Sequence, residues 1–186
     1  MVESQRKIQL KDKVFKPYLD KEKIKSAVSR IAENINRDLS GDHPLFLVVL
    51  NGSFMFAADL LREIHIPCSI SFIKVASYHG VNSSGSVTEL IGLTEEIKDK
   101  KVVIVEDIVD TGTTLEKLHQ LLVHRHVKEI KIATLLFKPE AYSKPIKVDY
   151  PGLTIPNDFV VGYGLDYDGE GRNLSEIYVL DEAQFK

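Results

Sequence analysis

The stretch VVIVEDIVDTGTTL, from Val102 to Leu115, decides the fold. It begins as an apolar, β-branched run of strand length, and three acids follow it at Glu106, Asp107 and Asp110. A small, hydroxyl-rich turn, TGTT at 111–114, then leads into helical spacing. The first N–H groups of a helix are unpaired and its dipole favours negative charge, so this strand, turn and helix predict an anion site.

The acids beside this turn narrow the kind of anion. Carboxylates repel a phosphate unless they bind something else, such as sugar hydroxyls or a metal ion that bridges to the ligand. We therefore expect a ribose phosphate, with the acids at the ribose and the turn's amides and hydroxyls at the 5′-phosphate. Taken singly, each residue also suits a solvated turn or a helix cap, and only the combination favours a site.

Two other site types share parts of this pattern. The tripeptide DTG at 110–112 occurs once per lobe in aspartic proteases, so this chain would have to dimerise to build their carboxylate pair. That fold is nearly all β, whereas helical spacing is plain here. A calcium loop of the EF-hand type has a different acid spacing, and no strand leads into it.

Working outward, apolar runs of strand length alternate with segments of helical spacing, which indicates an α/β fold. The run LFLVVL at 45–50 is apolar throughout, as in a strand covered on both faces of a parallel sheet. Helices are expected at 20–39, 54–64 and 115–123; strands at 45–50, 69–77, 102–105, 130–137, 159–165 and 177–180; and a long loop at 78–88. The predicted architecture is a mainly parallel, twisted sheet flanked by helices.

Composition excludes several classes of protein. The 186 residues suit one domain, and the formal net charge of -3 gives no overall attraction to nucleic acid or to anionic lipid. Cys68 is the only cysteine, so neither an intrachain disulfide nor a cysteine metal cluster is possible. No apolar run approaches the length of a membrane span, and the first residues lack the apolar core of a secretory signal. We expect a cytoplasmic protein without nucleic-acid or membrane partners.

At this point the sequence resembles the type I phosphoribosyltransferases, and specifically the hypoxanthine-guanine phosphoribosyltransferases, over most of its length. VVIVEDIVDTGTTL resembles their phosphoribosyl pyrophosphate motif. The resemblance implies a single domain at 1–186, with a core at about 20–150 and a small hood from the N-terminal segment and about 151–186. It also implies transfer of the phosphoribosyl group to N9 of hypoxanthine or guanine, giving IMP or GMP plus pyrophosphate. Mg²⁺ is the implied cofactor, and a homodimer or homotetramer the implied assembly.

The resemblance assigns roles within the motif. Asp110 is the implied general base or acid at purine N7, while Glu106 and Asp107 hold the ribose hydroxyls and, with Asp166, the metal. The 5′-phosphate ligands are then Thr111, Gly112, Thr113 and Thr114.

Two further segments resemble loops of the family. LNGSF corresponds to the pyrophosphate loop, formed by Leu50, Asn51 and Gly52, and the family often has a non-proline cis peptide that falls here at Leu50–Asn51. Many relatives carry lysine where Asn51 stands, so this chain has one charge fewer there. Ser77 and Tyr78 begin the segment that resembles the mobile lid over the reacting centre.

The remaining roles belong to the purine and to pyrophosphate. Lys138 is implied as a donor to the 6-oxo group, Phe159 as the ring that stacks on the base, and the Val160 backbone as a contact to its 2-position edge. Asp166 is the implied magnesium ligand, and Arg172 contacts pyrophosphate. Without the resemblance, Phe159 suits a core position and Arg172 a solvated surface.

Two rivals stay open. A regulator could keep this fold, bind RNA or DNA and sense the sugar phosphate, although it would need a basic face. The nearer rival is a transferase for another base such as xanthine, because the expected purine ligands separate the 6-oxopurines poorly.

Overall fold

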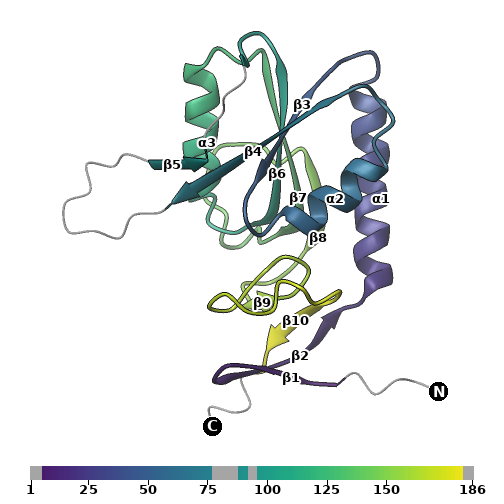
Figure 1. The fold of residues 1–186 in the computed structure, drawn as a ribbon, viewed down its shortest axis with the longest axis vertical. Coiled ribbons are helices and arrows are strands. Elements are labelled where there is room, and N and C mark those ends of the chain that lie inside the picture. Colours follow the sequence, from purple (N-terminus) through teal and green to yellow (C-terminus); the bar gives the residue numbers. More distant parts are fainter. Residues whose placement is uncertain (1–5, 77–87, 92–95, 182–186) are drawn as a thin grey trace.

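The computed structural model describes residues 6–76, 88–91 and 96–181, and over these the chain forms two sheets and three helices (Figure 1). The larger sheet has the strand order β5-β4-β3-β6-β7-β8, in which β4, β3, β6, β7 and β8 are parallel and β5 is an antiparallel edge. Its strands are β3 (Leu45–Val49), β4 (Ser69–Ala76), β5 (Thr88–Ile91), β6 (Lys101–Val109), β7 (Glu129–Phe137) and β8 (Tyr150–Thr154). The predicted α/β fold with a mainly parallel sheet is confirmed.

Alternate residues of the central strands enter two separate cores. In β3, Phe46 and Val48 join the cluster that contains α1 (Lys21–Asp38) and α2 (Phe54–Arg62). Leu45 and Leu47 join the other cluster, with α3 (Thr113–His124). Successive side chains of a strand point to opposite faces, so helices cover both faces of the sheet and every side chain of β3 is buried.

The first helix shows how the local sequence sets an element's bounds. The Asp20 side chain accepts a hydrogen bond from the Lys23 N–H at 2.9 Å, which satisfies one of the free donors at the N-terminus. Apolar side chains then recur at spacings of three and four, and these are buried: Ile24, Ala27, Val28, Ile31, Ala32 and Ile35. The buried stripe fixes α1 against β7 and β8.

The smaller sheet joins the two ends of the described chain. Its order is β1-β2-β10-β9, and all its pairings are antiparallel. The strands are β1 (Ile8–Leu10), β2 (Lys13–Leu19), β10 (Ile177–Leu180) and β9 (Val160–Val161). Figure 1 shows this sheet below the larger one. The division of the chain into a core and a hood stays a prediction.

The structure corrects the expected strand at 159–165. Only Val160–Val161 is a strand, because the next three residues, Gly162, Tyr163 and Gly164, all have positive φ, at 100°, 50° and 101°. Consecutive left-handed residues turn the chain out of an extended path. Strands β1, β2, β5 and β8 were not expected; of these, β2 contains Pro17, a residue that usually argues against a strand. In the described ranges, the helices are too short or too polar to cross a lipid bilayer.

Candidate active site

The predicted anion turn lies where β6 gives way to α3. Gly112 is the N-cap of α3 with φ 81°, a left-handed conformation that suits glycine, and a Cβ on it would overlap the Tyr142 ring. The Thr111 and Thr113 hydroxyls lie 3.2 Å apart. A depression of about 90 Å³ opens over the turn and is lined by Glu106, Ile108, Val109, Asp110, Thr111, Gly112, Thr113, Thr114 and Leu115. Its size and its helix N-terminus suit one phosphate group.

The two adjacent acids of β6 face different parts of the site. Glu106 lines the depression, whereas a Cβ on Gly52 would overlap the Asp107 carboxylate, which places Asp107 on the other side of the strand. Burial raises the pKa of both carboxyls: that of Asp107 rises to about 6, and that of Glu106 lies well above its usual value because of burial and the Asp107 charge. A hydrogen-bond donor or a cation beside either carboxylate would stabilise its ionised form.

Asp110 and Lys138 form an ion pair at the same edge of the sheet. Lys138 Nζ lies 3.1 Å from Asp110 Oδ2, and its side chain is only 8% exposed, against 45% for Asp110. The Lys138 N–H also donates to the Val109 carbonyl at 3.0 Å, which continues the pairing of β7 with β6. A fixed ammonium donor thus stands next to a carboxylate that solvent or a ligand can reach.

The loop after β3 supplies backbone to the same edge. The Leu50–Asn51 peptide is cis, at the predicted position, and the Ser53 hydroxyl donates to the Val49 carbonyl. Gly52 is buried against Asp107, and a Cβ on Gly164 would overlap the Gly52 carbonyl. Because β3, β6 and β7 are adjacent and parallel, their carboxyl ends meet at one edge, where ligands bind in open α/β sheets.

A segment from the C-terminal part of the chain, here called the C-terminal loop (Asp158–Leu174), closes the site. Arg172 Nη2 pairs with Asp166 Oδ1 at 2.6 Å, and Arg172 Nη1 donates to the Gly164 carbonyl at 2.7 Å. The Arg172 charge lowers the pKa of Asp107 and the Asp166 charge raises it, so both groups act on the Asp107 carboxylate. Gly52, Asp107, Asp166 and Arg172 are therefore brought together.

Phe159 lies on the side of the smaller sheet. Its ring is 46% exposed and makes an edge contact with Tyr167, with ring centres 5.9 Å apart. Within the described residues, no ring contact or hydrogen bond joins it to Lys138. The backbone of the buried Val160 pairs with β10. The structure thus brings the anion turn, Lys138, Gly52 and Arg172 toward one edge, whereas Phe159 and Val160 lie with the smaller sheet.

Ser77 and Tyr78, the expected start of the lid, lie outside the described residues. Among the described residues, no three His, Cys, Asp or Glu side chains are grouped as a ready metal site.

Sequence reasoning missed the hydrogen bond that the Tyr163 hydroxyl donates to Asp59 Oδ2 at 2.6 Å. The only signal for Tyr163 was its place between two glycines.

Comparison with known proteins shows which family the chain resembles. The model of the phosphoribosyl transferase domain matches residues 15–168. A hypoxanthine-guanine phosphoribosyltransferase of Streptococcus pneumoniae is 40% identical over 177 residues, 95% of this chain and 98% of its own. One from Lactococcus lactis is 42% identical over 168 residues, covering 90% and 91%. A hypoxanthine phosphoribosyltransferase structure from Staphylococcus aureus superposes with a TM-score of 0.84 at 38% identity, covering 91% of this chain and 93% of that one.

Proposed function

The chain belongs to the hypoxanthine-guanine phosphoribosyltransferase family, and we propose that the edge formed by the carboxyl ends of β3, β6 and β7 is its active site. It is an enzyme of purine salvage that transfers the 5-phosphoribosyl group of phosphoribosyl pyrophosphate to N9 of hypoxanthine or guanine. The products are IMP or GMP and pyrophosphate. The observation that carries the site is the Asp110–Lys138 pair beside the anion turn.

This pair matches one edge of a 6-oxopurine. N7 and O6 lie side by side on that edge, so an acid and an ammonium group about 3 Å apart can address both atoms at once. Asp110 accepts the proton that leaves N7 as N9 bonds to the sugar, and Lys138 donates to O6. An ammonium donates and cannot accept, so the 6-amino group of adenine is a mismatch.

The phosphoribosyl group occupies the anion turn. The amides and hydroxyls of residues 111–114 bind the 5′-phosphate, and Glu106 and Asp107 accept hydrogen bonds from the ribose hydroxyls. Burial raises the pKa of these two carboxyls, so the hydroxyl donors of a bound ribose stabilise the ionised form. Positively charged character that develops at the anomeric carbon lies next to this negative charge.

Pyrophosphate lies between the loop after β3 and the C-terminal loop. The backbone of Leu50, Asn51 and Gly52 binds it from one side, and Arg172 binds it from the other. Glu106, Asp107 and Asp166 offer the hard carboxylate oxygens that Mg²⁺ prefers, but the described residues do not group three of them, so these residues would hold the ion only together with oxygens of a bound substrate. When bound, the ion neutralises charge on the leaving pyrophosphate.

Phe159 and the lid complete the base site. The exposed ring of Phe159 stacks on the purine, and the Val160 backbone contacts its 2-position edge. Ser77 and Tyr78 begin the segment that closes over the reacting centre and excludes water.

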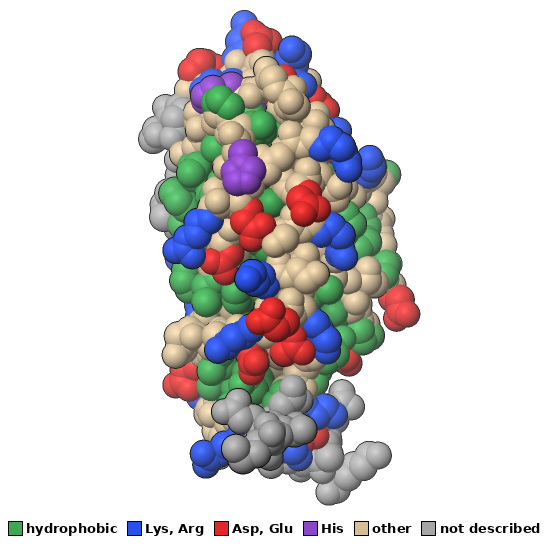
Figure 2. Space-filling model, turned by 90° about the vertical axis from the view of Figure 1, so that its right-hand side faces the viewer, with side chains coloured by type: hydrophobic (Ala, Val, Ile, Leu, Met, Phe, Trp, Pro, Cys, Tyr) green, Lys and Arg blue, Asp and Glu red, His purple; other side chains and the backbone are tan. Residues whose placement is uncertain are grey.

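We also propose that the protein is a cytoplasmic homodimer or homotetramer. Phe54, Ile70 and Phe72 are 45%, 46% and 46% exposed, and a second copy would cover such large apolar side chains. Figure 2, which looks onto the α1 side, shows acidic and basic side chains mixed over that face, so this face lacks the basic surface of the nucleic-acid-binding rival. Light scattering on the purified protein tests the assembly.

The reaction is tested by incubating the enzyme with phosphoribosyl pyrophosphate, magnesium and one base at a time: hypoxanthine, guanine, xanthine or adenine. We expect rapid nucleotide formation with hypoxanthine and guanine, and little with adenine. Fast turnover of adenine contradicts the role of Lys138, and preference for xanthine moves the assignment to the rival transferase.

A further inference from the structure

Tyr163 joins the C-terminal loop to α2. Its hydroxyl donates to Asp59 Oδ2 at 2.6 Å, and its ring packs in the core that contains α1 and α2. The residue is 5% exposed and sits at φ 50°, a conformation that non-glycine residues rarely adopt. Burial and the Asp59 carboxylate both raise the pKa of the phenol, so it remains a donor at physiological pH.

The residue after Tyr163 touches the pyrophosphate loop directly. Gly164 has φ 101°, and a Cβ on it would overlap the Gly52 carbonyl. Gly52 lies two residues before α2, the helix that carries Asp59. Neighbouring residues of the C-terminal loop are therefore fixed to neighbouring parts of the segment that starts at Gly52, one by backbone packing and one by a side-chain hydrogen bond.

From Gly164 the contacts lead to the charged groups of the site. The Gly164 N–H donates to the Arg172 carbonyl at 3.0 Å, and the Gly164 carbonyl accepts from Arg172 Nη1 at 2.7 Å. Arg172 in turn pairs with Asp166. The place of Gly164 thus sets where the Arg172 guanidinium stands relative to Gly52.

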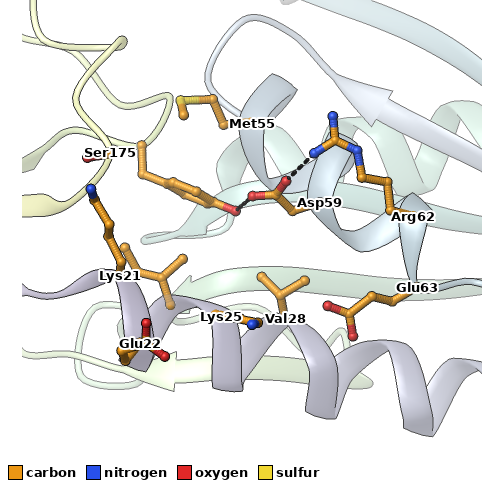
Figure 3. Close-up of a pocket in the computed structure, with 11 residues that line it drawn as sticks. Lys21, Glu22, Lys25, Val28, Met55, Asp59, Arg62, Glu63 and Ser175 are labelled. Carbon is orange, nitrogen blue, oxygen red and sulfur yellow. Dashed lines mark hydrogen bonds and ion pairs between the residues drawn. The ribbon is translucent and has the colours of Figure 1, made fainter.

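A cavity of about 380 Å³ borders this joint on the α1 side (Figure 3). It is lined by Lys21, Glu22, Ile24, Lys25, Val28, Met55, Asp59, Arg62, Glu63, Tyr163 and Ser175. Figure 3 shows Asp59 on α2, with Arg62 on one side of it and the open space below. Beside this space, the Tyr163 ring and the Tyr163–Asp59 hydrogen bond connect the C-terminal loop to α2.

We propose that Tyr163 and Asp59 form a tether that positions Arg172 and the Gly52 backbone for pyrophosphate. Neither residue of the tether touches the reacting atoms, so both are positioning residues. The inference rests on the proposed function, because it assumes that pyrophosphate binds between these two groups.

The test is Tyr163→Phe, which keeps the ring in the core and removes only the hydroxyl. We expect KM for pyrophosphate in the reverse reaction to rise on the order of 10-fold, since a hydrogen bond to a charged group is lost. KM for IMP should stay within about 2-fold, and the unfolding temperature should change little. A merely structural defect would lower kcat for both substrates together.

Variants of Asp59 supply a conservative rescue test and complete a double-mutant cycle with Tyr163. Asp59→Asn retains an oxygen acceptor and should behave nearly as the wild type, while Asp59→Ala should match Tyr163→Phe. The double variant Tyr163→Phe/Asp59→Ala should be no worse than either single one, because both remove the same bond. A matched control, Tyr178→Phe, whose hydroxyl bonds Glu176, should leave KM for pyrophosphate unchanged.

Direct titration with magnesium pyrophosphate, followed by calorimetry, separates the tether from the reaction. If binding weakens in Tyr163→Phe and Asp59→Ala but not in Asp59→Asn, the tether holds even if the wild type makes no nucleotide. Unchanged pyrophosphate affinity and KM in Tyr163→Phe would overturn the tether, while turnover of hypoxanthine by that variant would leave the proposed function intact.

Discussion

Two regions meet at the proposed pyrophosphate site, and they are built in different ways. The segment from Glu106 to Thr114 is continuous, and its own strand, turn and helix place its functional groups. The C-terminal loop is held by contacts to distant segments: Gly164 to Gly52, Tyr163 to Asp59, and Gly162 to the Glu176 backbone. The first region should therefore tolerate changes in its side chains without unfolding, whereas the second should lose its place when a single backbone contact is blocked.

The largest expected effect tests the continuous segment. Asp110→Asn should lower turnover by about 10²–10⁴-fold, because the amide cannot accept the N7 proton. It should still bind IMP and keep its free energy of unfolding within about 1 kcal/mol, since it preserves an acceptor for Lys138. Single-turnover kinetics and urea unfolding measure the two quantities. Near-normal turnover would show that Asp110 is not the general base. A large loss of stability would show that the continuous segment is as sensitive to substitution as the C-terminal loop.

Gly164→Ala tests the C-terminal loop. The left-handed backbone and the overlap with the Gly52 carbonyl should together cost about 3 kcal/mol of unfolding free energy. Gly169→Ala is the matched control in the same loop, because Gly169 also has a positive φ, 88°, but no atom within 4 Å of its added Cβ. That variant should lose about 1 kcal/mol from backbone strain alone. Equal losses in urea unfolding would show that packing against Gly52 does not hold the loop.

Lys138→Ala stands between the two regions, because its side chain meets the continuous segment from β7. We expect hypoxanthine affinity to fall about 10–100-fold, the usual range for a lost hydrogen bond from a charged donor, and the preference for oxo over amino bases to weaken. Lys101→Ala is the control, because Lys101 is an ion-paired, half-buried lysine at the opposite end of β6. Calorimetry measures hypoxanthine binding by both variants. Unchanged hypoxanthine affinity in Lys138→Ala would exclude Lys138 from the base site.

The smallest expected effect is the pH dependence of stability that comes from Asp107, which lies where the two regions meet. It is measured without magnesium or substrate. Burial raises the pKa of Asp107 to about 6, so between about pH 4 and pH 6 the folded protein holds a proton that the unfolded chain has released. Stability from this group is therefore lost as pH rises through that window. The free energy of unfolding of Asp107→Asn should exceed that of the wild type by about 1–2 kcal/mol at pH 7 and should be nearly the same as that of the wild type below pH 4.

Glu129→Gln gives the opposite sign for comparison. The Lys131 and Lys101 side chains lower the pKa of Glu129, so its contribution is present at neutral pH and is lost as pH falls. That variant should be slightly less stable than the wild type at pH 7. If the free energy of unfolding of Asp107→Asn had the same pH dependence as that of the wild type, burial would not destabilise the Asp107 carboxylate.

Sequence reasoning succeeded where the pattern is local. The strand at 177–180 agrees residue for residue with β10, and the small, hydroxyl-rich turn was placed between β6 and α3 as found, although Glu106 and Asp107 belong to β6 itself. The predicted strand at 102–105 was too short, because Glu106 and Ile108 also pair with β7 even though polar residues interrupt the apolar run. β-Pairing is decided by the neighbouring strand, which composition alone does not reveal.

The rest depended on tertiary contacts that leave little local signal. β2 and β8 contain Pro17 and Pro151, which lack the backbone donor of a regular strand, and they form because neighbouring strands pair with them: β1 and β10 with β2, and β7 with β8. The turn at 162–164 replaced an expected strand because its glycines fit against distant backbone. Nothing local pairs Tyr163 with Asp59, since the two residues are brought together only by the completed fold.

The order of the smaller sheet bears on how the protein is made. β10 lies between β2 and β9, so a strand from near the end of the chain must arrive before β2 gains its second neighbour. During synthesis, the strands β3, β6 and β7 leave the ribosome earlier and can pair with one another while the C-terminal part is still being added. Arg172 precedes β10 closely, so the half of the pyrophosphate site that it supplies is completed last. We expect amide protection in β3 and β6 to develop before that in β2 and β10, and pulse-labelling hydrogen exchange during refolding would measure the order.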